Sequence, residues 1–212
     1  MDGRIDRKAR PVHYNTWEAV YFDHDHDTLF KLAEKAAAVG AERYILDDGW
    51  FGSRRNDKAG LGDWWPSEDV YPQGLGPLVD HVTGLGMEFG LWFEPEMVNP
   101  DSELFRTHPD WILHAEGVEQ VPFRSQFVLD LTRPEVSDYL FDHMHKLLSA
   151  HDISYVKWDM NRDVHHPGSR GRPAINQQTR SLYGLIERLR AAHTDLDIES
   201  CSSGGARADY GS

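Results

Sequence analysis

Residues 155–162, with the sequence YVKWDMNR, begin as a short apolar strand and end in charged and amide side chains. Side chains two positions apart on a strand share a face, so Lys157 and Asp159 are predicted to point the same way. A fixed cation beside Asp159 favours the ionised carboxylate. The segment therefore predicts either a carboxylate nucleophile held at a strand end or a structural ion pair.

A second pair of carboxylates, Asp47 and Asp48, is followed directly by Gly49 and Trp50. Adjacent residues of a regular strand face opposite ways, but the twist into the following loop can bring both side chains to one rim. Such a pair suits a metal ion. It equally suits the vicinal hydroxyl groups of a sugar, because each hydroxyl group can donate a hydrogen bond to a carboxylate. Asp and Gly also favour turns, so a purely structural turn remains the alternative.

Several tryptophans lie near glycine, proline and acidic residues rather than in long apolar runs. They could form a stacking surface for the apolar face of a sugar ring, or they could belong to the core. The tryptophans in question are Trp17, Trp50, Trp64, Trp65 and Trp92.

The histidine-rich segments do not predict a metal site. Residues 23–27, with the sequence DHDHD, are typical of a solvated helix entrance with Asp27 as the N-cap. His165 and His166 lack the i, i+4 spacing of zinc-binding helices. No cofactor is expected either.

A lone cysteine, Cys201, precedes two serines and the glycines Gly204 and Gly205. The surroundings of a thiol or serine nucleophile are missing, because there is no G-x-S-x-G turn. The glycines instead allow backbone N–H groups to approach a ligand closely, with Cys201 as a small lining residue.

Strand-like and helix-like stretches alternate along the chain, and the chemically interesting residues follow the strands. Strands are predicted at residues 15–22, 43–46, 88–93, 126–131, 154–158 and 197–200. Helices are predicted at residues 28–39, 75–85, 102–107, 132–150 and 175–192. This alternation favours an α/β fold with a parallel sheet.

The distribution of the polar residues distinguishes between two parallel-sheet folds. Carboxylates, lysine and tryptophan lie at the ends of successive strands, as in a (β/α)8 TIM barrel. A doubly wound sheet would concentrate them at one switch point, and no G-x-G-x-x-G loop follows any strand. We therefore predict an incomplete (β/α)8 barrel comprising about the first six of eight strands.

Composition limits the partners. The 212 residues suffice for one domain, and the net charge of −13 without a basic stripe argues against nucleic acid and anionic membranes as partners. No stretch is long and apolar enough for a membrane span, and the polar N-terminus does not resemble a signal peptide. A single cysteine fits a reducing, cytoplasmic location.

Taken together, the motifs resemble glycoside hydrolase family 36, the bacterial-type α-galactosidases. They cover nearly the whole chain in the order and spacing of that family. The matching strings are NTWEA at 15–19, LDDGWFG at 46–52, GDW at 62–64, GLWFEPEM at 90–97, DW at 110–111, RSQ at 124–126, LDLT at 129–132, YVKWDMNR at 155–162 and ESCSSGG at 199–205.

The resemblance implies a role for each matching residue. Asp159 resembles the catalytic nucleophile, and Asp47 and Asp48 resemble the pair that holds the galactose hydroxyl groups, including the axial O4. The other implied sugar contacts are aromatic walls (Trp17, Trp92), polar partners (Arg124, Lys157, Asn161) and contacts near the 2-hydroxyl (Cys201, Gly204).

The resemblance also implies a retaining exo-α-galactosidase for melibiose- or raffinose-type oligosaccharides, homo-oligomeric when complete. In that family the general acid/base is an aspartate on a later strand, beyond Ser212. An N-terminal β-sandwich and a C-terminal β domain flank the barrel there and are absent from residues 1–212. We therefore expect this chain to be a partial catalytic domain, inactive and poorly soluble alone.

Three alternatives remain open. A galactosyl-transferring relative of the raffinose-synthase type would share the barrel and the nucleophile, although the LDDGWFG and GLGDWW loops favour the hydrolase. An α-N-acetylgalactosaminidase would differ in the pocket around Cys201. A non-catalytic galactose-binding remnant would keep the sugar contacts and lose turnover.

Overall fold

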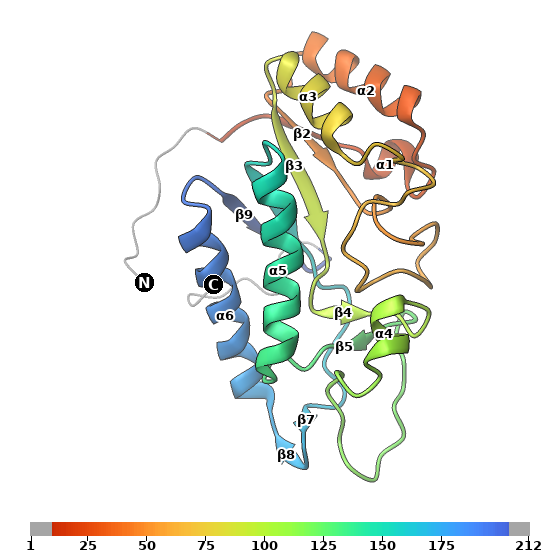
Figure 1. Cartoon of the computed structure of the whole chain (residues 1–212), viewed down its shortest axis with the longest axis vertical. Helices are drawn as coiled ribbons and strands as arrows, with labels where there is room; N and C mark the ends of the chain where they lie inside the picture. Colours follow the sequence, from red (N-terminus) through yellow and green to blue (C-terminus); the bar gives the residue numbers. More distant parts are fainter. Residues whose placement is uncertain (1–9, 204–212) are drawn as a thin grey trace.

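A five-stranded parallel sheet forms the centre of the computed structural model, which describes residues 10–203 (Figure 1). Its strands lie side by side in chain order, so each new strand joins the same edge of the sheet. They are β1 (His13–Asn15), β2 (Arg43–Leu46), β3 (Glu88–Phe93), β6 (Tyr155–Trp158) and β9 (Asp197–Ser200).

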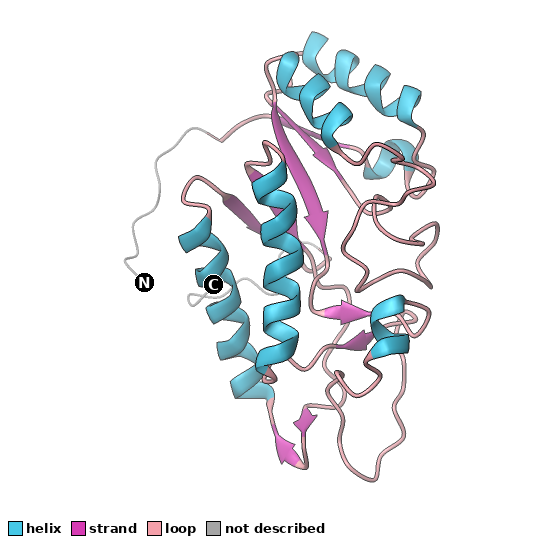
Figure 2. Cartoon of the chain, viewed as in Figure 1, coloured by secondary structure: helices cyan, strands magenta, loops and turns pink. Residues whose placement is uncertain are grey.

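Helices occupy most of the connections between these strands, and two short antiparallel pairs lie outside the sheet (Figure 2). The pairs are β4 (Met97–Val98) with β5 (Phe127–Val128), and β7 (Gly168–Ser169) with β8 (Arg172–Pro173). The helices are α1 (Trp17–Val20), α2 (His26–Ala38), α3 (Gly76–Gly84), α4 (Glu103–Thr107), α5 (Pro134–Ala150) and α6 (Ile175–Ala192). Within the described part of the chain, none of these helices has the length and apolar character of a membrane span.

Alternation along each strand separates the hydrophobic core from the polar face of the sheet. Tyr44 and Leu46 of β2 are fully buried in the core, as is Leu91 of β3. The residues between them in sequence fall on the opposite face, because successive side chains of a strand point to opposite sides. That opposite face carries Arg43 and Lys157.

The sheet is strongly curved toward this polar face. Arg43 on β2 and Asp197 on β9 are separated by three strand-to-strand steps, about 14 Å in a flat sheet. Yet Arg43 Nη2 lies 2.9 Å from Asp197 Oδ2. The ring centroids of His13 on β1 and Tyr155 on β6 are likewise 6.0 Å apart. Curvature of this kind brings side chains of distant strands together on the concave face.

Gly90 on β3 is a consequence of that curvature. A Cβ atom built at this position would lie 2.9 Å from the Tyr155 ring and 3.1 Å from the Ile45 side chain. Both residues are register partners of Gly90 on the neighbouring strands. The concave face is too crowded there for a side chain.

Two predicted strands differ from the structure. The strand expected at 15–22 ends at Asn15, and helix α1 starts at Trp17. The Asn15 side chain accepts the Trp17 N–H at 2.8 Å and the Thr16 hydroxyl accepts the Asp47 N–H at 3.0 Å, so both side chains draw the backbone out of the extended conformation.

The segment 126–131, expected as a strand of the parallel sheet, instead pairs antiparallel with β4 through β5. The parallel sheet therefore has five strands among the described residues rather than six, and β3 pairs directly with β6. Asp130, at the end of this segment, accepts hydrogen bonds from Ser169 and Thr132 at 2.5 and 2.6 Å. It serves the loop structure rather than the concave face.

The entrance to α2 also differs in detail. Asp25, not Asp27, is the N-cap, and its side chain accepts the Thr28 N–H at 2.8 Å. His24 is buried rather than solvated and hydrogen-bonds the Tyr71 hydroxyl at 2.7 Å. The predicted bounds of β2, β3, β9 and α6 agree with the structure.

Candidate active site

A cavity of about 320 Å³ opens where the strands of the concave face end. Most residues singled out from the sequence meet there, although they come from segments far apart in the chain. The predicted residues that line this cavity are Trp17, Asp47, Asp48, Trp92, Arg124, Lys157, Asp159 and Asn161.

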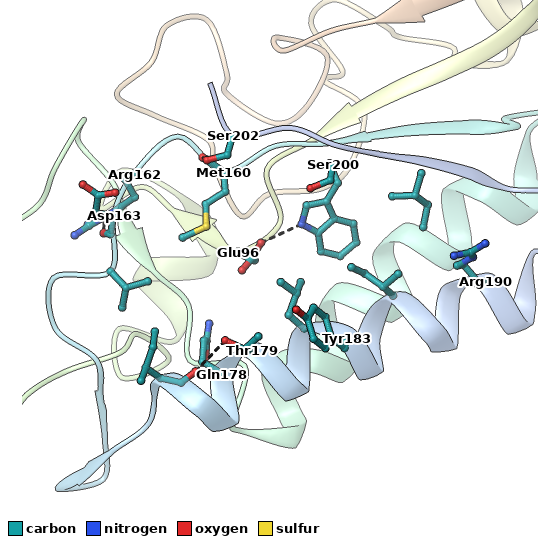
Figure 3. Close-up of a pocket in the computed structure, with 16 residues that line it drawn as sticks. Glu96, Met160, Arg162, Asp163, Gln178, Thr179, Tyr183, Arg190, Ser200 and Ser202 are labelled. Carbon is teal, nitrogen blue, oxygen red and sulfur yellow. Dashed lines mark hydrogen bonds between the residues drawn. The ribbon is translucent and has the colours of Figure 1, made fainter. Parts of the chain in front are cut away.

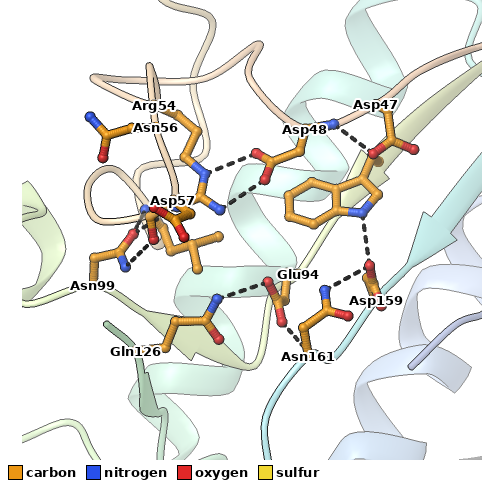
Figure 4. Close-up of polar contacts among 12 residues, drawn as sticks. Asp47, Asp48, Arg54, Asn56, Asp57, Glu94, Asn99, Gln126, Asp159 and Asn161 are labelled. Atoms are coloured by element: carbon orange, nitrogen blue, oxygen red, sulfur yellow. Dashed lines mark hydrogen bonds and ion pairs between the residues drawn. The ribbon is translucent and has the colours of Figure 1, made fainter. Parts of the chain in front are cut away.

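The Asp159 carboxylate, directly after β6, is held by three donors, of which Figure 4 draws the two side-chain donors. Its Oδ2 atom accepts the Trp92 indole N–H at 3.2 Å and the Asn161 side-chain amide at 2.8 Å. Its Oδ1 atom accepts the Met160 backbone N–H at 2.9 Å. These bonds fix the carboxylate at the cavity wall, and its lone pairs are not all used.

Lys157 faces the same cavity as Asp159, as the strand alternation predicts, but its direct ion-pair partner is different. Lys157 Nζ lies 2.8 Å from Asp47 Oδ2. A direct structural ion pair between Lys157 and Asp159, one of the two alternatives, is therefore not formed, and Lys157 acts on Asp159 only as a nearby charge. Burial alone would lower the pKa of Lys157, but Asp47, with smaller contributions from Cys201 and Asp159, raises it above the ordinary value.

Asp47, which directly follows β2, contacts side chains from two other strands. Besides Lys157 of β6, its Oδ2 atom accepts the Asn15 amide of β1 at 2.6 Å. Its Oδ1 atom accepts the Asp48 N–H at 2.9 Å, which makes the backbone turn sharply after β2. Asp47 thus shapes the turn, as the structural alternative predicts, and it also lines the cavity; its contact with a sugar stays a prediction.

Asp48 forms a two-point ion pair with Arg54, a residue that sequence reasoning missed. Arg54 Nε and Nη2 donate to the two oxygens of Asp48 at 2.9 and 2.8 Å, and both side chains are buried. Burial raises the pKa of Asp48, and the Arg54 guanidinium opposes that rise. An arginine in the loop directly after paired carboxylates was the available sequence signal.

Glu94 is a second carboxyl group on the cavity wall beside Asp159. It is 1% exposed and accepts hydrogen bonds from the Asn161 N–H and, at 3.3 Å, from the Gln126 amide. Burial raises the pKa of Glu94 to about 7, opposed by the Asn161 hydrogen bond and reinforced by the Asp159 charge. A carboxyl group with this pKa changes its protonation near neutral pH.

The five tryptophans divide between the cavity and the core. Trp17 is half-buried at the cavity wall and Trp92 also lines it, so these two fit the predicted aromatic walls. Trp50 and Trp64 are buried in the hydrophobic core, and Trp65 is partly exposed beside His143.

Cys201 is half-buried and does not line this cavity, although its charge interaction with Lys157 places it nearby. Gly204 lies outside the described residues, so its predicted contact stays a prediction. No group of three or more metal-ligating side chains is arranged around a common point within residues 10–203.

A second cavity, of about 430 Å³, lies between strands β6 and β9 and helix α6 (Figure 3). Apolar residues of α6, including Leu182 and Ile186, form much of its wall. Among its polar residues, Glu96 accepts a hydrogen bond from the Trp158 indole N–H at 3.1 Å. None of the predicted site residues lines this cavity, so the smaller cavity is the candidate active site.

The sequence profile of the melibiase family matches residues 1–212. An α-galactosidase of Escherichia coli is 52% identical over 205 residues, which are 97% of this chain and 29% of that protein. The crystal structure of the family 36 α-galactosidase AgaA of Geobacillus stearothermophilus superimposes with a TM-score of 0.92 at 41% identity, covering 96% of this chain and 29% of that one. A variant of AgaA has also been solved in complex with raffinose, with the same TM-score and coverage. The chain thus spans less than a third of the length of these relatives.

Proposed function

The chain belongs to the melibiase family, and we propose that the protein that carries it is a retaining exo-α-galactosidase. The observation that carries the proposal is the Asp159 carboxylate, which three hydrogen bonds hold at the wall of a cavity that also contains Asp47, Asp48 and Lys157. The family membership and the raffinose complex of AgaA support an α-galactoside as the substrate.

In the proposed first step, an Asp159 oxygen forms a bond to the anomeric carbon while the bond from that carbon to the leaving oxygen breaks. The leaving oxygen takes a proton from a general acid, and water later releases galactose from Asp159 with the opposite proton movement. Hydrogen bonds from Trp92 and Asn161 orient Asp159 for this attack.

Retention requires a second carboxyl group about 5–5.5 Å from the nucleophile. Glu94 shares the cavity with Asp159, but the family resemblance gives it no role as the acid. We therefore keep the assignment of the general acid to an aspartate on a later strand of a longer protein, as the family resemblance implies. The share of the relatives that this chain covers is consistent with that assignment.

We assign recognition of the galactosyl hydroxyl groups, including the axial O4, to Asp47 and Asp48. Lys157, Arg124 and Asn161 supply further polar contacts around the cavity. The remaining proposed contacts are the aromatic walls Trp17 and Trp92 and, near the 2-hydroxyl, Cys201 and Gly204. Melibiose- and raffinose-type sugars are the proposed substrates.

The curved sheet supports an incomplete (β/α)8 barrel as the architecture. All five strands are parallel and lie in chain order, whereas a doubly wound sheet reverses its order at a switch point. The side chains of the concave face converge as the interior of a barrel does. We also propose that the complete protein is a cytoplasmic homo-oligomer.

The test is covalent trapping in the complete gene product that contains this chain. An activated 2-fluoro-galactosyl inhibitor should inactivate the protein and label a single peptide. Mass spectrometry should place the label on Asp159, and Asp159→Asn should abolish both labelling and hydrolysis of nitrophenyl α-galactoside. Because the residue reacts rather than only binding, turnover should fall by orders of magnitude.

Asp163→Asn is the matched control, since Asp163 follows the same strand and is exposed outside the cavity. It should leave labelling unchanged. A label on Asp47, Asp48 or Glu94 would contradict the assignment of the nucleophile. A well-folded wild-type protein that cleaves no α-galactoside would contradict the proposed function.

A further inference from the structure

A two-residue turn at the cavity mouth has an unfavourable backbone conformation. Phe123 and Gln126 pair as an antiparallel bridge, and Arg124 and Ser125 between them have φ angles of 53° and 58°. Turns with two positive φ angles favour Asn and Gly, because larger side chains crowd the backbone there. Such a conformation persists only when its surroundings hold it, and Arg124 at this turn lines the cavity.

A side-chain amide from outside the cavity holds the turn. Asn99 Nδ2 donates a hydrogen bond to the Ser125 carbonyl at 2.7 Å, and Asn99 is completely buried. Arg162 donates a second bond to the next carbonyl, that of Gln126. The turn is thus fixed from its inner side.

The carbonyl oxygen of the same amide binds Arg54, which also lines the cavity (Figure 4). Asn99 Oδ1 accepts hydrogen bonds from Arg54 Nη1 at 3.1 Å and from the Leu61 backbone N–H at 2.8 Å. Arg54 in turn binds both oxygens of Asp48. One buried amide therefore connects the turn that carries Arg124 to the guanidinium that fixes Asp48.

We propose that Asn99 is a positioning residue that sets the separation of Arg124 and Asp48 at the cavity and thereby the affinity for the galactosyl unit. The inference rests on the proposed galactosidase function. The position requires both a donor and an acceptor, and only an amide of this length supplies them. Aspartate keeps the shape and the acceptor but has no N–H for the Ser125 carbonyl.

The first test is Asn99→Asp in the complete gene product, assayed with nitrophenyl α-galactoside. Loss of the donor and repulsion between the new carboxylate and the Ser125 carbonyl should release the turn. We expect KM to rise roughly ten-fold, the equivalent of a lost hydrogen bond to a charged or buried group. The kcat value should change far less, because Asp159 keeps its own contacts.

A double-mutant cycle separates positioning from general stability. If Asn99 acts through Arg124, Asn99→Asp should raise KM much less in an Arg124→Ala background than in the wild type. Equal effects in the two backgrounds would overturn the inference, as would an unchanged KM in the single variant.

A matched pair at the half-buried Ser125 tests the turn without altering the buried amide. Glycine adopts a positive φ freely, so Ser125→Gly should leave KM unchanged, whereas proline fixes φ near −65° and Ser125→Pro should raise KM as Asn99→Asp does. This pair decides the matter if Asn99→Asp does not fold. An unchanged KM in Ser125→Pro overturns the inference while wild-type activity upholds the proposed function. An inactive wild type contradicts both.

Discussion

Lys157 Nζ lies 2.8 Å from Asp47 Oδ2, so a lysine on β6 forms an ion pair with a carboxylate at the end of β2. The two strands are not neighbours, because β3 lies between them. The ion pair spans the intervening strand on the concave face, where the proposed sugar-binding carboxylate shares a cavity with Asp159. It therefore couples the architecture of the sheet to the chemistry of the cavity.

Removing one partner of this ion pair should cost more stability than removing both. Lys157→Met leaves the buried Asp47 carboxylate without its counter-charge. This loss should lower the free energy of unfolding by about 3 kcal/mol. The double variant Asp47→Asn/Lys157→Met should recover part of that loss. Urea denaturation of the wild type, both single variants and the double variant measures the effect, and additive losses would contradict it.

Asp48 should determine the preference for galactose over glucose. A site built to hydrogen-bond a hydroxyl group rejects an analogue that points it elsewhere, because buried acceptors are left unpaired. Asp48→Asn should therefore lower kcat/KM for nitrophenyl α-galactoside by far more than for the α-glucoside. Some stability should also be lost, since Arg54 is buried with it.

The exposed Asp57 at the same cavity offers the control for this experiment. Asp57→Asn should change the galactoside-to-glucoside ratio little. If Asp48→Asn instead lowers only the melting temperature and leaves both kinetic constants intact, the carboxylate serves the turn and not the sugar.

The part of this site that the sequence predicts follows strand periodicity. Asp159 and Lys157 on one face, Trp92 on the neighbouring strand and the carboxylates after β2 were all recognisable from spacing of two residues and from positions at strand ends. The bounds of β2, β3 and β9 were recognisable for the same reason. Short-range pattern is sufficient for these features.

The rest depends on contacts between distant residues. The Asp47–Lys157 ion pair joins residues 110 positions apart on strands that are not neighbours, and the Arg54–Asn99 contact joins residues 45 positions apart. The error at 126–131 has a related cause, because an apolar strand that pairs with β4 has the same local pattern as one in the parallel sheet. Burial of Glu94 likewise emerges only from the assembled fold.

Glu94 should make stability fall as pH rises toward neutrality. Its pKa is raised from 4.5 to about 7 in the folded protein, so the folded state retains a proton that the unfolded state releases. The contribution of Glu94 is complete below pH 4.5 and is lost as pH rises to about 7. Glu94→Gln mimics the protonated form at every pH. The difference in free energy of unfolding between this variant and the wild type should therefore shift in favour of the variant from pH 5 to pH 8.

Denaturant titrations at several pH values check this expectation. The Gln126 Oε1 atom, which has no partner among the described residues, can accept the new amide after a side-chain flip. Glu119→Gln at an exposed site is the control and should show no such trend. A constant difference between Glu94→Gln and wild type across the pH range would contradict the raised pKa.

His24 should act in the opposite direction at acid pH. Burial lowers its pKa from 6.5 to about 4, so the unfolded chain binds a proton that the folded protein does not. Its stabilising effect is present above pH 6.5 and is lost as pH falls to about 4. The loss should amount to about 3 kcal/mol across this interval.

His24→Gln should flatten this acid dependence, measured as the free energy of unfolding from pH 7 to 4. A Gly49 Cβ would lie 2.9 Å from His24 Nε2, so the ring supports the turn of the paired carboxylates and some loss at pH 7 is also expected. The exposed His165 supplies the control variant His165→Gln. An acid dependence unchanged by His24→Gln would contradict the assignment.

The curvature marked by the Arg43–Asp197 ion pair has a kinetic consequence. These residues are 154 positions apart, and Asp47 and Lys157 are 110 apart, so the concave face closes only after very long segments have been brought together. Non-local contacts of this kind make folding slow, because the entropy of loop closure must be lost before the contacts form. During refolding, helical signal should therefore recover well before sugar binding does, and the regained affinity would report the completion of the sheet.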